Sequence, residues 1–220
     1  LRAYSYFRLV RAFGDVPLRL TVPKDPSEYN IPRSPKADVY AAIEQDLTDA
    51  AGVLPQSYPA TEVGHATKGA ALALHAKVAM YQAKWDDVLN YTNQVMGLGY
   101  ALFPDFEQLF RVANENCSES IFEIQASLIP DNQQASNSQY SQIQGVRGLS
   151  PSVGWGFNVP TQALVDAFET DDPRKDATII FRGETTPEGD AIPSTGDNPM
   201  YNQKSYVPQS MMVNGFTEGC

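Results

Sequence analysis

The chain has 220 residues, of which 42% are hydrophobic and 10% aromatic, which is enough apolar material for a globular core. Its 16 Lys and Arg against 26 Asp and Glu give a net charge of −10. This balance argues against a nucleic-acid or anionic-membrane surface, because phosphate binding needs an excess of cations. Two cysteines exclude a disulfide scaffold and a four-cysteine zinc site. No apolar run reaches the roughly 18–20 residues that span a bilayer.

Residues 1–100 predict helices joined by short turns. Tyr4, Phe7 and Val10 have helical spacing from the first residues onward, so we expect the chain to be an interior portion of a longer one. This first helix ends in the Gly and Pro residues of 13–17. A second helix is expected to begin at Ser34, as N-cap, with the proline that follows in its first helical position.

The next two predicted helices form a pair. Thr67 caps an alanine-rich helix that extends to about residue 81, and Trp85 opens a fourth helix that ends at Gly97 or Gly99. Small side chains let helix axes approach closely. His75, on a helix of alanines and leucines, is expected to be a packed residue rather than a ligand, and Trp85 to be a core residue rather than a platform for a ligand. The helix–turn–helix layout resembles tetratricopeptide units of about 34 residues, with an irregular α-bundle as the alternative.

Residues 101–220 predict a loop-rich part. Alternating apolar residues at 121–126 indicate a short strand. Thr161 opens a short predicted helix in which Leu164 faces inward, and residues 182–220 consist mostly of turn signals. The predicted fold is therefore mainly α, with helix pairs in 1–100, a loop-rich part in 101–220 and few short strands.

Residues suited to catalysis or metal binding are sparse. His65 and His75 lack the spacing of a zinc pair, and there is no nucleophile elbow or phosphate-binding glycine loop, so we expect no metal, no cofactor and no catalytic residue. A glycosidase would need two carboxyl groups about 5–10 Å apart. The acidic residues that the sequence offers for such a pair are Asp46, Asp86, Asp87, Glu119, Glu123, Asp166, Glu169, Asp171 and Asp172. A solvated acidic surface is the alternative for most of them.

A polar tract at 127–160 is the best candidate for a ligand site. It contains 14 Ser, Asn and Gln and only two charged residues, with aromatic residues spread through it. Aromatic rings stack on sugar C–H faces while amides bond to hydroxyl pairs, so this composition suits a neutral polyhydroxylated ligand. An ordinary polar surface loop has the same composition, and Trp155 also suits a packing role. The predicted ligand-binding residues are Tyr140, Gln142, Arg147, Trp155 and Asn158.

Several segments together carry a family resemblance. They occur in a fixed order along almost the whole chain: 6–18, with its Phe-Gly-Asp-Val-Pro run; 31–47; 66–74; 85–86; 100–102; 118–124; 154–161; and 172–174. In this order they resemble the SusD/RagB family of Bacteroidetes outer-membrane nutrient-binding lipoproteins.

The resemblance implies a fold of tetratricopeptide-like helix pairs and a function in binding without catalysis. Its members capture glycans, or sometimes peptides, at the cell surface and deliver them to a SusC-like TonB-dependent outer-membrane transporter. A lipid anchor is implied by kinship only. Two other functions remain open: a tetratricopeptide-type scaffold that binds protein or peptide, and a glycosidase with an unrecognised carboxylate pair.

Overall fold

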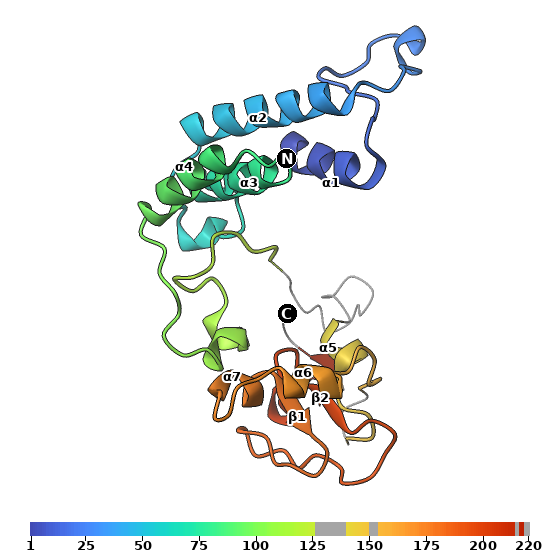
Figure 1. The fold of residues 1–220 in the computed structure, drawn as a ribbon, viewed down its shortest axis with the longest axis vertical. Helices are drawn as coiled ribbons and strands as arrows, with labels where there is room; N and C mark the ends of the chain where they lie inside the picture. The colour runs from blue at the N-terminus through green and yellow to red at the C-terminus, as the bar shows by residue number, and fades with distance from the viewer. Residues whose placement is uncertain (126–139, 150–153, 214–215, 218–220) are drawn as a thin grey trace. The chain divides into compact units, whose positions relative to one another are not determined.

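The computed structural model describes residues 1–125, 140–149, 154–213 and 216–217 (Figure 1). The chain forms two compact units. The first unit comprises Leu1–Ala101 and Ser118–Glu123, and the second comprises Leu102–Cys117 and Ile124–Cys220. The prediction of a mainly α fold with few short strands is confirmed. Among the described ranges, no helix has the length and apolar character required to cross a membrane.

Four helices make up most of the first unit, and each packs on the next one in the chain (Figure 1). They are α1 (Arg2–Phe13), α2 (Lys36–Val53), α3 (Lys68–Met80) and α4 (Trp85–Met96), with the short 3-10 turns η1 (Pro26–Glu28) and η2 (Ala60–Glu62) between them. The small side chains of α3 allow α2 and α4 to pack against it, which buries most of its length.

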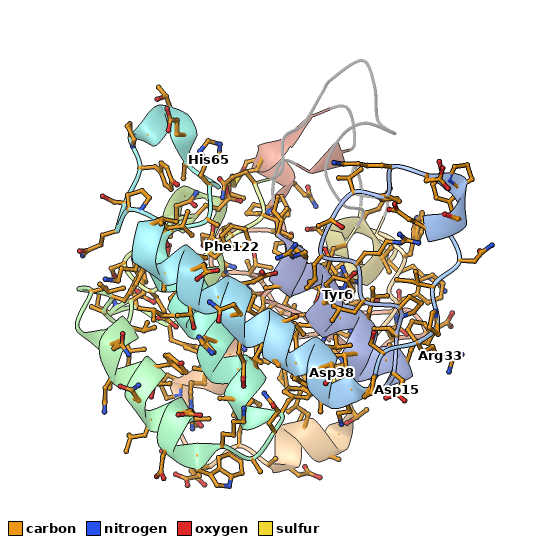
Figure 2. All side chains as sticks on the ribbon, turned by 90° about the horizontal axis from the view of Figure 1, so that it is seen from above. Tyr6, Asp15, Arg33, Asp38, His65 and Phe122 are labelled. Atoms are coloured by element: carbon orange, nitrogen blue, oxygen red, sulfur yellow. The ribbon has the colours of Figure 1, made fainter. Side chains whose placement is uncertain are left out.

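The N-terminus of α2 is capped from another part of the chain. The prediction that Ser34 caps this helix is wrong, because the N-cap position is Pro35, which makes no side-chain cap bond. Instead Asp15 Oδ1 accepts a hydrogen bond of 2.7 Å from the backbone N–H of Lys36. Figure 2 labels Asp15 and, in the first turn of α2, Asp38. Gly14 has a φ of 70°, which turns the chain after α1 and brings Asp15 to this position. The predicted cap of α3 is confirmed, since the Thr67 side chain accepts from Ala70 N.

The core of the first unit is formed by one buried face from each of α1, α2 and α3. The buried side chains that line it include Phe7, Val10, Val39, Tyr40, Ile43, Leu47 and Val78. At the edge of this core, Arg2 pairs with Asp46 at 2.6 Å and also donates to the carbonyl of Leu20, which joins α1 to α2 and to the loop between them.

Two of the packing predictions in the first unit have different outcomes. His75 is 4% exposed and its ring stacks on Tyr91 with centroids 3.9 Å apart, as predicted. Burial lowers the pKa of His75 below its ordinary value.

The prediction that Trp85 packs in the core is wrong, because its side chain is exposed at the start of α4. The strand expected at 121–126 is absent over 121–125, which has no regular secondary structure, and residue 126 lies outside the described residues.

The second unit has a small core around short elements. Its helices are α5 (Tyr140–Gln144), α6 (Gln162–Asp166) and α7 (Pro173–Asp176), with 3-10 turns η3 (Gln108–Phe110), η4 (Val112–Asn114) and η5 (Gln209–Met211). Antiparallel pairs are formed by β1 (Ile179–Phe181) with β2 (Met200–Asn202), and by β3 (Met212–Val213) with β4 (Phe216–Thr217). Val146, Leu149, Ile180, Ile192, Tyr201 and Tyr206 form the core. Thr161 caps α6 as predicted, but Leu164 is exposed rather than inward-facing.

Candidate functional site

The five residues that the sequence predicts for ligand binding all lie in the second unit, on two segments held side by side. Tyr140 and Gln142 belong to α5, and Arg147 follows this helix. Trp155 and Asn158 lie in the segment 154–158, which we call the aromatic loop. The structure brings the two segments together, whereas the part of the polar tract at 127–139 lies outside the described residues.

Backbone hydrogen bonds hold the aromatic loop against α5. Trp155 N donates to the carbonyl of Gln142 at 2.9 Å, and Phe157 N donates to that of Ile143 at 2.9 Å. Between them, Gly156 N donates to the carbonyl of Gly145 at 3.0 Å. Main-chain pairing of this kind fixes where the side chains of the loop emerge, whatever those side chains are.

Two glycines make this approach possible. Gly154 packs directly on the backbone of Gly145, and a Cβ at Gly154 would lie 2.3 Å from the Gly145 carbonyl carbon. Gly156 has a φ of 65°, a backbone conformation that side chains with a Cβ rarely adopt. Its carbonyl accepts a hydrogen bond of 2.8 Å from Asn198 Nδ2, which ties the loop to a distant part of the chain.

A buried amide supports the aromatic loop from beneath. Gln144 is 3% exposed, and its Oε1 accepts from Asn158 Nδ2 at 3.2 Å and from Asn202 Nδ2 at 2.7 Å. Asn158 has a φ of 50°, a conformation that Asn tolerates better than most residues. Asn158, predicted as a ligand residue, therefore has a structural bond of its own, and Gln144 is a supporting residue that the sequence did not reveal.

Aromatic side chains are exposed on the surface of this loop. Trp155 is 38% exposed and Phe157 is 55% exposed, and their rings meet edge to face with centroids 6.4 Å apart. Tyr140, on α5, is 50% exposed. Edge-to-face packing restrains each ring through the other. The pair therefore presents apolar surface whose orientation is largely set before any ligand arrives.

A charged pair stands beside the aromatic rings. Arg147 Nε donates to the carbonyl of Trp155 at 3.1 Å, which leaves the Nη groups directed to other partners. Arg147 Nη1 lies 3.9 Å from Asp197 Oδ2, and both side chains are well exposed. Asp197 was not among the predicted site residues. The Arg147 guanidinium thus offers hydrogen-bond donors, and the Asp197 carboxylate offers acceptors, on the surface beside the aromatic rings.

The core below the site contains one strongly perturbed group. Tyr206 donates its hydroxyl to Asp190 Oδ2 at 2.6 Å, and the same oxygen accepts from the backbone N–H of Gln209 at 2.9 Å. Burial, reinforced by the Asp190 carboxylate, raises the pKa of Tyr206 far above its ordinary value. The hydroxyl thus stays protonated and acts as a structural donor.

Several carboxylates considered for a glycosidase pair have local structural roles. Asp46 binds Arg2. Asp172 caps α7 through Arg174 N and pairs with the Arg174 guanidinium at 2.6 Å, and Asp166 accepts from Gln162 at 2.8 Å. Within the ranges that the structure describes, no three His, Cys, Asp or Glu side chains gather as metal ligands. The arrangement at the aromatic loop suits reversible binding of a molecule with both apolar faces and hydroxyl groups.

Comparison with known proteins supports one family. Residues 1–80 match a family model described as SusD-like, starch-binding and associating with the outer membrane. A SusD-like protein P2 of Formosa agariphila is 29% identical over 211 residues, covering 88% of this chain and 40% of the relative. A solved laminarin-binding SusD-like protein is 28% identical with a TM-score of 0.81, covering 98% of this chain and 52% of the other. The chain is therefore similar to SusD-like proteins over most of its length.

A second solved structure shares the fold of this chain. Surface glycan-binding protein A of Bacteroides thetaiotaomicron, solved in complex with laminarihexaose, has a TM-score of 0.72 at 20% identity, covering 96% of this chain and 48% of the other. At that identity the likeness concerns the fold. The chain spans about half the length, or less, of these relatives.

Proposed function

We propose that this SusD-like chain binds a neutral glycan without catalysing any reaction, and that the ligand stacks on the aromatic loop. The observation that carries the proposal is the exposed pair Trp155 and Phe157, held on a loop that main-chain bonds fix to α5. An apolar platform that is ordered in advance costs little conformational entropy when a ligand binds.

Hydrogen-bonding groups around the platform match the hydroxyl groups of a sugar. Arg147 offers guanidinium donors and Asp197 offers carboxylate acceptors at 3.9 Å from each other. A hydroxyl group both donates and accepts, so two neighbouring hydroxyls satisfy such a pair. The net charge of −10 disfavours polyanionic polysaccharides. Tyr140 and Gln142, on α5 beside the loop, complete the proposed set of ligand-binding residues, together with Trp155, Arg147 and Asn158.

The names of two relatives support a neutral glucan as the first ligand to test. One is described as laminarin-binding, and the other was solved in complex with laminarihexaose.

The partner and the location of the protein are proposed from its likeness to SusD-like proteins. The proposed partner is a SusC-like TonB-dependent transporter that receives the glycan, and the proposed location is the outer membrane at the cell surface with a lipid anchor. The family description, which names the outer membrane, supports this location.

The experiment is calorimetric titration of the full chain with laminarihexaose and with other oligosaccharides. Trp155 exposes 38% of its surface, which amounts to roughly 90 Å² for a side chain of this size. If a sugar covers about half of that area, the contact is worth about 1 kcal/mol, so Trp155→Ala is expected to weaken binding by about sixfold. Phe157→Ala should weaken it by a similar factor. Trp85→Ala is the matched control, because Trp85 is also exposed but lies in the first unit.

Chromatography of the same samples tests for turnover. Binding that is weakened in Trp155→Ala, retained in Trp85→Ala and accompanied by no shorter products supports the proposal. Release of shorter oligosaccharides would indicate a glycosidase instead. Binding of peptides, with no binding to any glycan, would favour the tetratricopeptide-type scaffold.

A further inference from the structure

Positive charge is concentrated at the start of the chain. Residues 1–36 contain seven Lys and Arg but only three Asp and Glu, although the whole chain carries a net charge of −10. Helix α1 contains three arginines and no acidic residue, and α3 contains no acidic residue either. Of the three arginines, Arg2 is neutralised by Asp46.

Aromatic rings hold the other two arginines of α1. The Arg8 guanidinium carbon lies 5.8 Å from the centroid of the Tyr4 ring. The Arg11 guanidinium carbon lies 4.7 Å from the Phe7 centroid and 5.2 Å from the Tyr81 centroid, and its Nη1 donates to the Tyr81 hydroxyl at 3.1 Å. A guanidinium that rests on ring faces keeps the rest of its N–H edge available for a carboxylate.

Neither arginine is neutralised by the surrounding chain. Across the parts of the chain that the structure describes, Arg8 and Arg11 form no ion pair with an Asp or Glu. The Debye length is about 8 Å at physiological ionic strength, so acidic groups farther away cancel little of their field. Both side chains are exposed. They therefore remain free to attract a negative partner.

The side chains around these arginines have the composition of a protein interface. Tyr4 is 45% exposed and Tyr81 is 48% exposed, and Phe13 extends the exposed apolar surface at the end of α1. Tyr, Phe and Arg are enriched at protein–protein interfaces, where Tyr and Arg often dominate the binding energy. We call Tyr4, Phe7, Arg8, Arg11 and Tyr81 the arginine–aromatic cluster.

We propose that the arginine–aromatic cluster is a docking surface for an acidic segment of a partner protein. Carboxylates of that segment pair with the guanidinium edges of Arg8 and Arg11, and its apolar groups cover Tyr4 and Tyr81. Because the rings already restrain both arginines, docking immobilises little further side-chain freedom. The proposal concerns the first unit and is independent of glycan binding at the aromatic loop.

The test uses fluorescence anisotropy of a labelled ten-glutamate peptide titrated with the full chain, beside a neutral Gly-Ser peptide of the same length. The double variant R8Q/R11Q removes the two cluster charges. The matched control, K24Q/R33Q, removes two charges from exposed residues of the same unit that lie outside the cluster. R8Q/R11Q is expected to weaken binding of the acidic peptide by about fivefold, while the control stays within about twofold of the parent. R8K/R11K keeps the charges but lacks the guanidinium edges, so it should bind the acidic peptide more weakly than the parent and more tightly than R8Q/R11Q. Circular dichroism of each variant separates a loss of binding from a loss of folding.

Several outcomes would overturn this assignment. Absence of acidic-peptide binding, or equal weakening in R8Q/R11Q and K24Q/R33Q, contradicts a specific docking surface. Preferential binding to phosphatidylglycerol vesicles, lost in R8Q/R11Q, would identify a lipid surface as the occupant instead. Laminarihexaose binding measured on the same variants separates this proposal from the glycan site, since R8Q/R11Q should leave it unchanged.

Discussion

Replacement of Gly154 by alanine tests whether the backbone of the aromatic loop packs on α5 as closely as the structure indicates. Its Cβ would lie 2.3 Å from the Gly145 carbonyl carbon and 2.5 Å from the Val146 carbonyl oxygen. Ordinary van der Waals contact begins at 3.4 Å, so one of the two segments has to move by about 1 Å. Both neighbours are backbone atoms, and no side-chain rotation relieves the overlap.

The cost follows from the hydrogen bonds that this movement breaks. Three backbone bonds, donated by Trp155, Gly156 and Phe157, join the loop to residues 142–145. At about 1 kcal/mol net for each bond, Gly154→Ala is expected to lower the free energy of unfolding by about 2–3 kcal/mol. Because the aromatic rings move with the loop, laminarihexaose binding should weaken as well.

Gly52→Ala provides the same chemical change with the opposite expectation. Gly52 lies in α2, and a Cβ there would meet nothing within 4 Å. Alanine in a helix should therefore raise stability by about 0.5–1 kcal/mol. Thermal unfolding gives the stability of both variants, and hydrogen exchange of a peptide covering 154–158 reports on the loop itself. If Gly154→Ala matches the parent in unfolding, in exchange and in glycan affinity, the close backbone packing is refuted.

Two further predictions concern the first unit. Asp15→Ala removes the oxygen that caps α2 and should lower the free energy of unfolding by about 1 kcal/mol in urea titration, whereas Asp25→Ala, which removes the cap of only the short turn η1, should change it little. His75 has a pKa below its ordinary value of 6.5 because it is buried, so the unfolded chain binds a proton first as the pH falls. The contribution of the neutral ring to stability is fully present above pH 6.5 and is lost as the pH falls from there toward the lowered pKa. His75→Gln should accordingly lose less unfolding free energy than the parent between about pH 7.5 and pH 5.5, and equal slopes would contradict the burial of a neutral ring.

The helices of the first unit were predictable because their signals are local. Apolar residues at helical spacing, a Thr at the N-cap of α3 and the glycine after α1 all act within one or two turns. The cap of α2 was not predictable in this way, since Asp15 lies 21 residues before the N–H group that it accepts from. The prediction that Trp85 is buried failed for a related reason. Its position in the helix shows which residues share its face, but only the packing of neighbouring helices decides whether that face is buried.

At the candidate site the sequence predicted two segments but not what holds them together, and their role in ligand binding stays a prediction. The polar composition at 127–160 and its aromatic residues led to Trp155 and Arg147, and the structure brings both to one surface. Gln144 and Asn198 were missed, because their partners lie up to 58 residues away in the chain. The glycines on either side of Trp155 were the one local signal of a close backbone approach.

In the aromatic loop, the residues that hold the backbone in place differ from those that are exposed to a ligand. Glycines, backbone groups and the amides of Gln144 and Asn198 hold the loop in place, whereas Trp155 and Phe157 leave much of their surface exposed. Substitution of either aromatic residue therefore removes little of what positions the backbone. The exposed rings and the charged groups beside them are free to change while the scaffold stays folded. A ligand preference set in this way would depend on a few exposed side chains, and for that reason composition alone does not name the ligand.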